Sequence, residues 1–256
     1  MNVNEIRELK GKRKITMLTA YDYQIARILE DAEIDLILVG DSLGMVFQGN
    51  PDTKKVTMAA MEYHTLAVAQ GAKNTLIVSD MPIHSYDIPE EALANAQQLI
   101  QAGAHAVKIE GNQPEVITVL LENRIPVMGH VGLLPQFAEK YKVQGKTPKQ
   151  ADQIWRDALN LEKLGVFSMV LECIPEWLAR KITHDVKIPT IGIGAGKHCD
   201  GQVLVITEVL GLVGNQYLPK FSKPFANLDK TIRDAIIEFM DEVRTGKYPD
   251  KQHTYH

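Results

Sequence analysis

The sequence predicts an α/β protein with a (β/α)₈ barrel, formed as a single domain over residues 1–256. Three observations lead to this class. Short runs rich in valine, isoleucine and leucine recur along the chain, and each indicates a parallel strand buried on both faces. Stretches of helical period separate these runs, which is the pattern of βαβ units. Eight such units in about 250 residues fit a closed barrel, with an open doubly wound sheet as the alternative.

The predicted strands share an apolar run that ends at a glycine or a polar residue. In chain order they are Ile15–Ala20, Leu36–Val39, Thr75–Asp80, Ala106–Glu110, Pro126–His130, Ser168–Glu172, Pro189–Gly194 and a weaker eighth strand at Val209–Val213.

The predicted helices fill the intervals between the strands, and several begin with a proline or an acidic residue, as the first helical turn favours. They cover residues 3–10, 23–32, 57–70, 89–102, 114–123, 148–164, 176–182 and 228–245. The last of these is an amphipathic C-terminal helix. A loop rich in glycine, asparagine and proline is predicted over residues 45–55.

Composition and charge narrow the function classes. The formal net charge is −4, so there is no basic surface for nucleic acid or an anionic membrane. The two cysteines, Cys173 and Cys199, lack the spacing of a metal site or of a disulfide framework. No apolar run approaches the length that spans a bilayer, and the polar start is unlike a signal peptide. We therefore expect a cytoplasmic protein that acts on small molecules.

Ionisable residues follow the predicted strands at the end where barrel enzymes bind their ligands. They are Asp41, Asp80, Lys108, Glu110, His130 and Glu172. Each one alone has a structural explanation, such as a cap on the next helix or a turn hydrogen bond. Ser42, beside Asp41, also suits a cap. Together they predict a cluster of four carboxylates, a lysine and an imidazole at one mouth of the barrel.

Such a cluster requires positive charge, because removing several carboxylates from water costs several kcal/mol per ion. Lys108 supplies one charge, and a divalent metal would supply two. An all-oxygen ligand set favours Mg²⁺. A 2-oxo acid chelates such an ion through its keto and carboxylate oxygens, which acidifies the neighbouring C–H bond. The residues therefore predict enolate chemistry, with Glu172 as the base.

The chain resembles the ketopantoate hydroxymethyltransferase (3-methyl-2-oxobutanoate hydroxymethyltransferase) family over nearly its whole length. The matching segments are Lys14–Asp22, Val39–Val46, Asp80–Pro82, Val107–Gly111, Gly129–Leu133, Leu171–Pro175, Ile191–Gly196 and Cys199–Leu204. Leu134 stands where the family pattern has threonine. It lies next to a pocket segment but carries none of the roles below.

The resemblance implies the first step of pantothenate biosynthesis, which leads toward coenzyme A. In that step 5,10-methylenetetrahydrofolate donates a one-carbon unit to 3-methyl-2-oxobutanoate, giving 2-dehydropantoate through a Mg²⁺-bound enolate. The resemblance also implies one Mg²⁺ per subunit. It further implies a homo-oligomer, a decamer that is a pentamer of dimers.

Residue roles come from the same resemblance. Asp41 and Asp80 match the Mg²⁺ ligands, and Glu110 matches the third carboxylate of the metal site. The contacts to the 2-oxo acid match Asp41, Ser42, Asp80 and Lys108, and His130 matches a residue that lines the same pocket. Glu172 matches the proton acceptor.

Three other functions compete with this one. Another Mg²⁺-dependent 2-oxo acid aldolase, lyase or phosphonomutase of similar barrel is the main alternative, and such enzymes tend to carry a catalytic cysteine in a mobile loop. Lys108 could instead form a Schiff base, although Glu110 on the same strand face argues against it. A barrel without activity that serves as a scaffold is the third.

The glycine-rich stretch Gly192–Gly196 indicates a tight turn, because it lacks the dinucleotide-binding fingerprint.

Overall fold

The structure is a computed structural model that describes residues 1–214 and 218–255. It divides into two compact units, Met1–Val205 and Ile206–His256. Each unit is described by itself below, and the single-domain organisation over residues 1–256 stays a prediction.

The first unit is a closed barrel in which every strand pairs in parallel with its neighbours in sequence order. The barrel closes where Ile15 of the first strand aligns with Gly201 of the last. This closure confirms the predicted (β/α)₈ class and excludes the open doubly wound sheet. The strands are β1 (Ile15–Thr19), β2 (Leu36–Val39), β3 (Leu76–Asp80), β4 (Ala106–Lys108), β5 (Val127–Gly132), β6 (Ser168–Glu172), β7 (Thr190–Ile193) and β8 (Gly201–Leu204).

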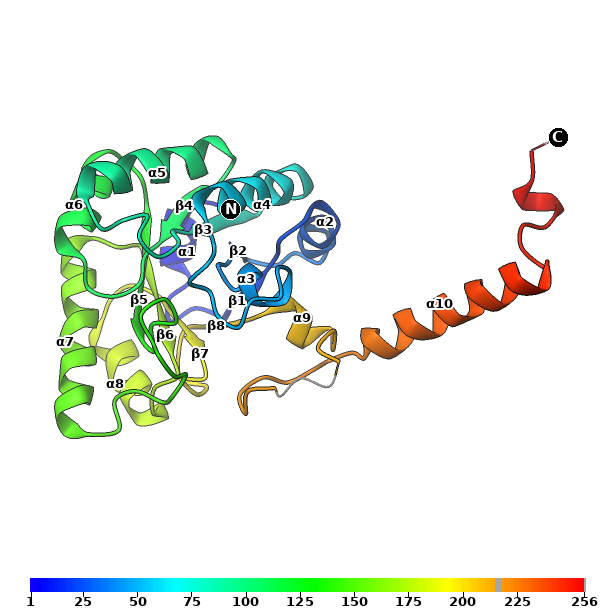
Figure 1. Cartoon of the computed structure of the whole chain (residues 1–256). Helices are drawn as coiled ribbons and strands as arrows, with labels where there is room; N and C mark the ends of the chain where they lie inside the picture. The colour runs from blue at the N-terminus through cyan, green and yellow to red at the C-terminus, as the bar shows by residue number, and fades with distance from the viewer. Residues whose placement is uncertain (215–217, 256) are drawn as a thin grey trace. The chain divides into compact units, whose positions relative to one another are not determined.

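Helices surround this barrel, as Figure 1 shows for α2 and for α4 to α8. The helices of the first unit are α1 (Val3–Glu8), α2 (Tyr23–Asp31), α3 (Leu43–Val46), α4 (Met58–Gly71), α5 (Pro89–Gln101), α6 (Pro114–Glu122), α7 (Pro148–Leu164) and α8 (Glu176–Asp185). Their starts follow from local chemistry. The side chains of Asp22, Thr57 and Thr147 each accept a hydrogen bond from a backbone amide in the first turn of α2, α4 and α7.

The predicted position of the eighth strand, Val209–Val213, was wrong. The apolar residues of Val209–Val213 belong to the end of a short helix and a turn, in which the amide of Leu210 donates to the carbonyl of Ile206. The actual strand β8 has exposed Gln202 between buried Gly201 and Val203. Because one of its faces is uncovered, β8 alternates in polarity and lacks the continuous apolar run that marks a strand buried on both faces.

The core of the first unit fills the N-terminal half of the barrel lumen. Inward-facing residues of the strands, such as Leu36, Leu76 and Met128, form one cluster with Ile6 of α1. The helix α1 therefore closes this end of the barrel. A capping box stabilises its start, because Asn2 accepts from the amide of Glu5 while the Glu5 side chain accepts from the Asn2 amide.

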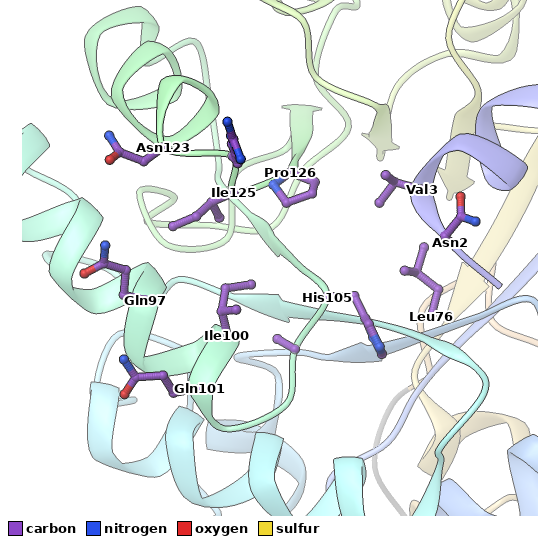
Figure 2. Close-up of a pocket in the computed structure, with 12 residues that line it drawn as sticks. Asn2, Val3, Leu76, Gln97, Ile100, Gln101, His105, Asn123, Ile125 and Pro126 are labelled. Atoms are coloured by element: carbon purple, nitrogen blue, oxygen red, sulfur yellow. The ribbon is translucent and has the colours of Figure 1, made fainter.

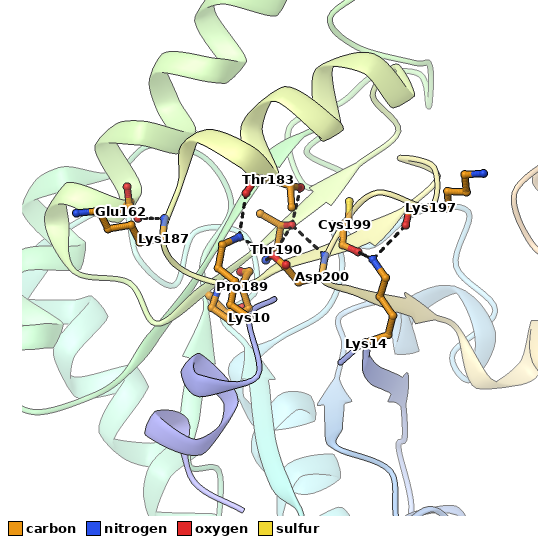
Figure 3. Close-up of polar contacts among 11 residues, drawn as sticks. Lys10, Lys14, Glu162, Thr183, Lys187, Pro189, Thr190, Lys197, Cys199 and Asp200 are labelled. Atoms are coloured by element: carbon orange, nitrogen blue, oxygen red, sulfur yellow. Dashed lines mark hydrogen bonds and ion pairs between the residues drawn. The ribbon is translucent and has the colours of Figure 1, made fainter. Parts of the chain in front are cut away.

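Polar contacts tie the segment after α1 to the same end of the barrel (Figure 3). Lys10 Nζ lies 2.7 Å from Asp200 Oδ2 and donates to the carbonyl of Thr183 at 2.9 Å. Asp200 Oδ2 also accepts from the Thr190 amide at 2.9 Å. Lys14 Nζ donates to backbone carbonyls of residues 197 and 199. This network of contacts suits a role in stability, since ligands bind at the opposite end of such barrels.

The second unit contains α9 (Ile206–Val209), α10 (Leu228–Thr245) and the 3₁₀ turn η1 (Lys251–His253). The helix α10 agrees with the predicted bounds 228–245. It begins at Asn227, whose side chain accepts from the Lys230 amide, and ends at Gly246 in a left-handed conformation. Within residues 1–214 and 218–255, no helix is both long and apolar enough to cross a membrane.

Substituting Ile6→Ala should lower the free energy of unfolding by about 2–5 kcal/mol, because it leaves a cavity where α1 closes the barrel. Ile6 is 0% exposed, whereas Ile28 on α2 is 51% exposed and provides the control variant Ile28→Ala. Urea unfolding followed by circular dichroism measures both. Equal losses for the two variants would show that α1 does not contribute to the core.

Candidate active site

The inward face of the strands changes from apolar to ionisable along the barrel. On β3, Leu76 and Val78 belong to the lumen core, and Asp80 follows two residues later on the same face. The same alternation brings the other ionisable residues to this level. They are Lys108 after Ala106, His130 after Met128, and Glu172 after Val170. The predicted cluster therefore forms at the C-terminal end of the barrel.

Lys108 lies at the centre of this cluster. It aligns with Asp80 across β3 and β4, and its Nζ is 3.1 Å from Asp80 Oδ1 and 3.2 Å from His130 Nδ1. Burial acts to lower the pKa of the Lys108 ammonium, but the carboxylates of Asp80 and Glu110 outweigh it and raise this pKa above its ordinary value. Lys108 is therefore a fixed positive charge and not a free amine.

Asp41 and Asp80 lie side by side at the ends of β2 and β3. The backbone amide of Asp41 donates to Asp80 Oδ2 at 3.0 Å. Burial, with the charge of Asp80 added, raises the pKa of Asp41 to about 7. Asp80 Oδ1 is buried and makes its ion pair with Lys108, yet it has no hydrogen bond of good geometry among the described residues. This oxygen therefore keeps unused capacity to accept a hydrogen bond.

His130 is a buried neutral ring between Lys108 and Glu172. Burial and the charge of Lys108 hold the pKa of His130 well below its usual value. Since the Lys108 ammonium can only donate, Nδ1 is the acceptor nitrogen and Nε2 carries the proton. His130 Nε2 is 3.2 Å from Glu172 Oε2, outside hydrogen-bonding geometry. His130 is therefore confirmed as part of the cluster, and its role toward substrate stays a prediction.

Glu172 is the most accessible carboxylate of the cluster, with 16% of its side chain exposed. Burial raises its pKa to about 7, against the opposing effect of Lys108. The backbone around it is held closely by β5. The Leu133 amide donates to the Glu172 carbonyl at 2.9 Å, and a Cβ on Gly132, which has a φ of +104°, would lie 2.2 Å from that carbonyl. Only glycine permits this approach.

Ser42 lies in the turn between β2 and α3 and does not cap that helix with its side chain. Its hydroxyl is instead 2.8 Å from the hydroxyl of buried Tyr21.

Glu110 lies beyond the end of β4 and is buried, and its Oε1 is 3.7 Å from His130 Nδ1. Burial raises the pKa of Glu110 well above its ordinary value, with Lys108 opposing.

The structure adds Gln136, which the sequence reasoning missed. Gln136 Nε2 donates to Asp41 Oδ2 at 2.9 Å, and its backbone amide donates to Glu110 Oε2 at 3.1 Å. It lies three residues beyond the matched segment Gly129–Leu133, in the connection from β5 to α7. A search limited to ionisable residues at strand ends cannot find a neutral amide in a loop.

Neither of the two cysteines is placed as a nucleophile. Cys173 follows Glu172 directly, and burial raises its pKa to about 12. Burial also raises the pKa of Cys199. The stretch Gly192–Gly196 forms the predicted turn, with φ of +79° at Gly196, where a Cβ would lie 2.6 Å from Glu176 Cγ.

A cavity of about 680 Å³ lies at the opposite end of the barrel (Figure 2). It lies beside the starts of β3 and β5, with Leu76, His105 and Pro126 in its lining. None of its twelve described lining residues is a carboxylate. The cavity therefore lacks the carboxylates that the cluster at the C-terminal end brings together.

A closed (β/α)₈ barrel with a buried ionisable cluster at its C-terminal mouth defines a barrel enzyme. The family model for ketopantoate hydroxymethyltransferase matches residues 1–251. The 3-methyl-2-oxobutanoate hydroxymethyltransferase of Clostridium beijerinckii is 51% identical over 251 residues, which cover 95% of this chain and 91% of that protein. The enzyme of the same name from Thermotoga neapolitana is 49% identical and covers 100% of this chain and 96% of its own length. The chain belongs to the ketopantoate hydroxymethyltransferase family, as its sequence motifs predicted.

Solved structures with the same fold are more distant in sequence. Phosphonopyruvate hydrolase in complex with oxalate and Mg²⁺ has a TM-score of 0.65 at 13% identity, covering 99% of this chain and 93% of its own. The 2,3-dimethylmalate lyase of the PEP mutase/isocitrate lyase superfamily has a TM-score of 0.62 at 16% identity, and the match covers 98% of this chain and 91% of the lyase. At these identities the likeness shows the barrel fold alone.

The raised pKa of Glu172 predicts a pH dependence of stability. The pKa in the folded state is about 7, against an ordinary value of 4.5. Between these values the folded protein keeps a proton that the unfolded chain has lost, so stability falls as the pH rises through this window. The variant Glu172→Gln lacks this effect. Relative to wild type it should gain up to about 3 kcal/mol of unfolding free energy between pH 5 and pH 8.

Urea unfolding in the presence of EDTA at several pH values measures this difference. Glu122→Gln, which removes an exposed carboxylate at the end of α6, is the control. Parallel pH curves for wild type and Glu172→Gln would contradict the raised pKa.

Proposed function

We propose that this enzyme transfers the one-carbon unit of 5,10-methylenetetrahydrofolate to 3-methyl-2-oxobutanoate. The products are 2-dehydropantoate and tetrahydrofolate, with one water consumed, and the reaction is the first step of pantothenate biosynthesis. The observation that carries the proposal is the convergence of Asp41, Asp80, Lys108 and Glu172 at one barrel mouth. The name shared by relatives about half identical in sequence supports the substrate.

The chemistry of the cluster fits a hard divalent cation. Four carboxylates face one ammonium group and one neutral imidazole, and Asp80 Oδ1 has no hydrogen bond among the described residues. Among the described residues, no group of three Asp, Glu, His or Cys side chains is close enough to hold a metal ion by itself. Mg²⁺ suits this arrangement, because it takes few protein carboxylates and keeps waters and substrate oxygens.

We therefore assign Asp41 and Asp80 as ligands of one Mg²⁺ per subunit, with Glu110 as the third carboxylate of the site. The fold relative phosphonopyruvate hydrolase has been solved with oxalate and Mg²⁺, and a bound 2-oxo acid offers similar oxygens. When bound, the ion supplies Lewis acidity that makes the C–H bond beside the keto group easier to ionise.

Lys108 binds the carboxylate of the oxo acid in this proposal. Asp80 and His130 hold its ammonium group in place, at 3.1 and 3.2 Å. Asp41 and the adjacent Ser42 contact the substrate from the end of β2. The competing Schiff-base mechanism needs a neutral lysine, and the raised pKa of Lys108 opposes that form.

Glu172 accepts the proton from C3 of the oxo acid. Its pKa of about 7 matches a general base that works near neutral pH, and its partial exposure places it toward the mouth. The C3–H bond breaks, the proton passes to Glu172, and C3 forms a bond to the methylene carbon once one of its two C–N bonds to the folate has opened. The second C–N bond then breaks, water supplies the hydroxyl group, and tetrahydrofolate leaves. The protonated Nε2 of His130 lies 3.2 Å from Glu172 Oε2, so its partial positive charge faces this carboxylate.

A 2-oxo acid lyase or phosphonomutase remains the second candidate because enzymes of these classes share the fold. A cysteine-dependent reaction is disfavoured by the raised pKa of both Cys173 and Cys199. An inactive scaffold is disfavoured because a buried group of carboxylates costs stability without serving any purpose there.

We further propose a homodecamer, a pentamer of dimers, in the cytoplasm. The family resemblance supports the assembly. Two cysteines without a disulfide suit a reducing compartment.

An assay of purified enzyme with 3-methyl-2-oxobutanoate and 5,10-methylenetetrahydrofolate tests the proposed reaction. Formation of 2-dehydropantoate should be lost in EDTA and restored by excess Mg²⁺, because the carboxylate cluster then regains its cation. Mass spectrometry of the product and absorbance of the folate measure it. Turnover in EDTA would contradict the metal assignment, and absence of product under all conditions would favour the second candidate.

Glu172→Gln should slow the exchange of the C3 proton of 3-methyl-2-oxobutanoate with solvent by about 10²–10⁴-fold, since the variant lacks the base. Proton NMR in D₂O with Mg²⁺ and without folate follows this exchange. Glu122→Gln is again the control. Exchange at the wild-type rate in Glu172→Gln would show that a residue other than Glu172 removes the C3 proton.

A further inference from the structure

One neutral residue holds the carboxylate cluster together from the connection between β5 and α7. Gln136 is buried, and its side-chain amide donates to Asp41 Oδ2 and to the Met81 carbonyl, both at 2.9 Å. Its backbone amide donates to Glu110 Oε2 at 3.1 Å. Two carboxylates from different strand ends are thus bound by the same residue.

The orientation of this amide is set by Tyr86. The Tyr86 hydroxyl donates to Gln136 Oε1 at 2.5 Å, and the tyrosine ring is buried. An amide turned the other way would point its oxygen at Asp41 Oδ2 and at the Met81 carbonyl, which are acceptors only. The network therefore admits one orientation, in which both N–H groups face acceptors and the oxygen faces a donor.

A neutral donor suits this position for an electrostatic reason. Carboxylates this close repel one another, which favours protonation of one of them or rotation of its oxygens away from the others. A lysine or arginine here would bind them but would compete with a divalent cation for the same charge. An amide fixes the carboxylates while leaving their negative charge available to the cation.

We propose that Gln136, held by Tyr86, is a positioning residue that presets Asp41 and Glu110 for a divalent cation. This inference rests on the proposed function, because that function is what assigns a divalent cation to these carboxylates. Outer partners of metal-binding carboxylates are worth about 10–100-fold in metal affinity when they are removed. Gln136 therefore acts through the carboxylates and not by contact with the reacting atoms.

Titration of the purified enzyme with Mn²⁺ alone, followed by electron paramagnetic resonance, tests this role without any turnover. Gln136→Met keeps the length of the side chain and removes the amide, and its Mn²⁺ affinity should fall about 10–100-fold. The matched control is Gln153→Met on α7, because Gln153 Nε2 also donates to a carboxylate, Asp157 Oδ1, at 3.0 Å but on an exposed surface. Wild-type affinity in a folded Gln136→Met protein would overturn the inference.

Tyr86→Phe provides a second variant that removes one hydroxyl and keeps the ring. It should weaken Mn²⁺ binding in the same direction but less than Gln136→Met, because the amide stays present without its fixed orientation. In the double variant Tyr86→Phe/Gln136→Met the tyrosine change should have no further effect on Mn²⁺ affinity. Independent, additive losses would show that Tyr86 does not act through Gln136.

Crystal structures of metal-free wild type and of both single variants separate this inference from the proposed function. If wild type itself binds no Mn²⁺, the metal assignment fails. The role of Gln136 is then decided by comparing the positions of the Asp41 and Glu110 side chains in the crystal structures of wild type and the variants. Displaced or disordered Asp41 and Glu110 side chains in the variants support positioning by Gln136. Carboxylates that stay in their wild-type positions overturn it.

Discussion

The constraint on which this site depends is the burial of four carboxylates in one barrel mouth. Closure of the sheet brings Asp41, Asp80, Glu110 and Glu172 together, and burial raises the pKa of three of them: Asp41, Glu110 and Glu172. Lys108 supplies only one positive charge, and the imidazole beside it is neutral. Carboxyl groups therefore outnumber the positive charges in the mouth, and in the proposed function this imbalance supplies the affinity for a cation and a base that titrates near neutral pH.

Neutral polar groups arrange these charges without cancelling them. His130 Nδ1 accepts a hydrogen bond from Lys108, and its Nε2 lies 3.2 Å from Glu172 Oε2, so the neutral ring separates the ammonium from the proposed base. Gln136 donates hydrogen bonds to both Asp41 and Glu110. The Gln136 side chain has all its hydrogen bonds formed, and a fully hydrogen-bonded buried group holds one geometry, whereas a partly bonded one permits several. The orientation of Asp41 and Glu110 thus depends on a residue that carries no charge itself.

Much of this arrangement could be predicted from the sequence, because its signals are local. Seven strands were found from their apolar runs, and α7 and α10 agree with the predicted bounds. The eighth strand was misplaced, because β8 is covered on one face only and lacks a continuous apolar run. Glu110 was predicted on a strand but lies after the end of β4. Gln136 was missed, because nothing in its own sequence neighbourhood marks a neutral loop residue as a partner of Asp41.

The sequence by itself determined the fold class, the family and the residues that carry charge at the strand ends. Those properties follow from periodicity and from the order of short motifs, which are written along the chain. Only the tertiary structure decided which of these groups touch, that His130 is neutral and that Asp41 and Glu172 have a pKa of about 7. Desolvation and through-space charge set these properties, and the neighbours that produce them lie tens of residues apart in the chain.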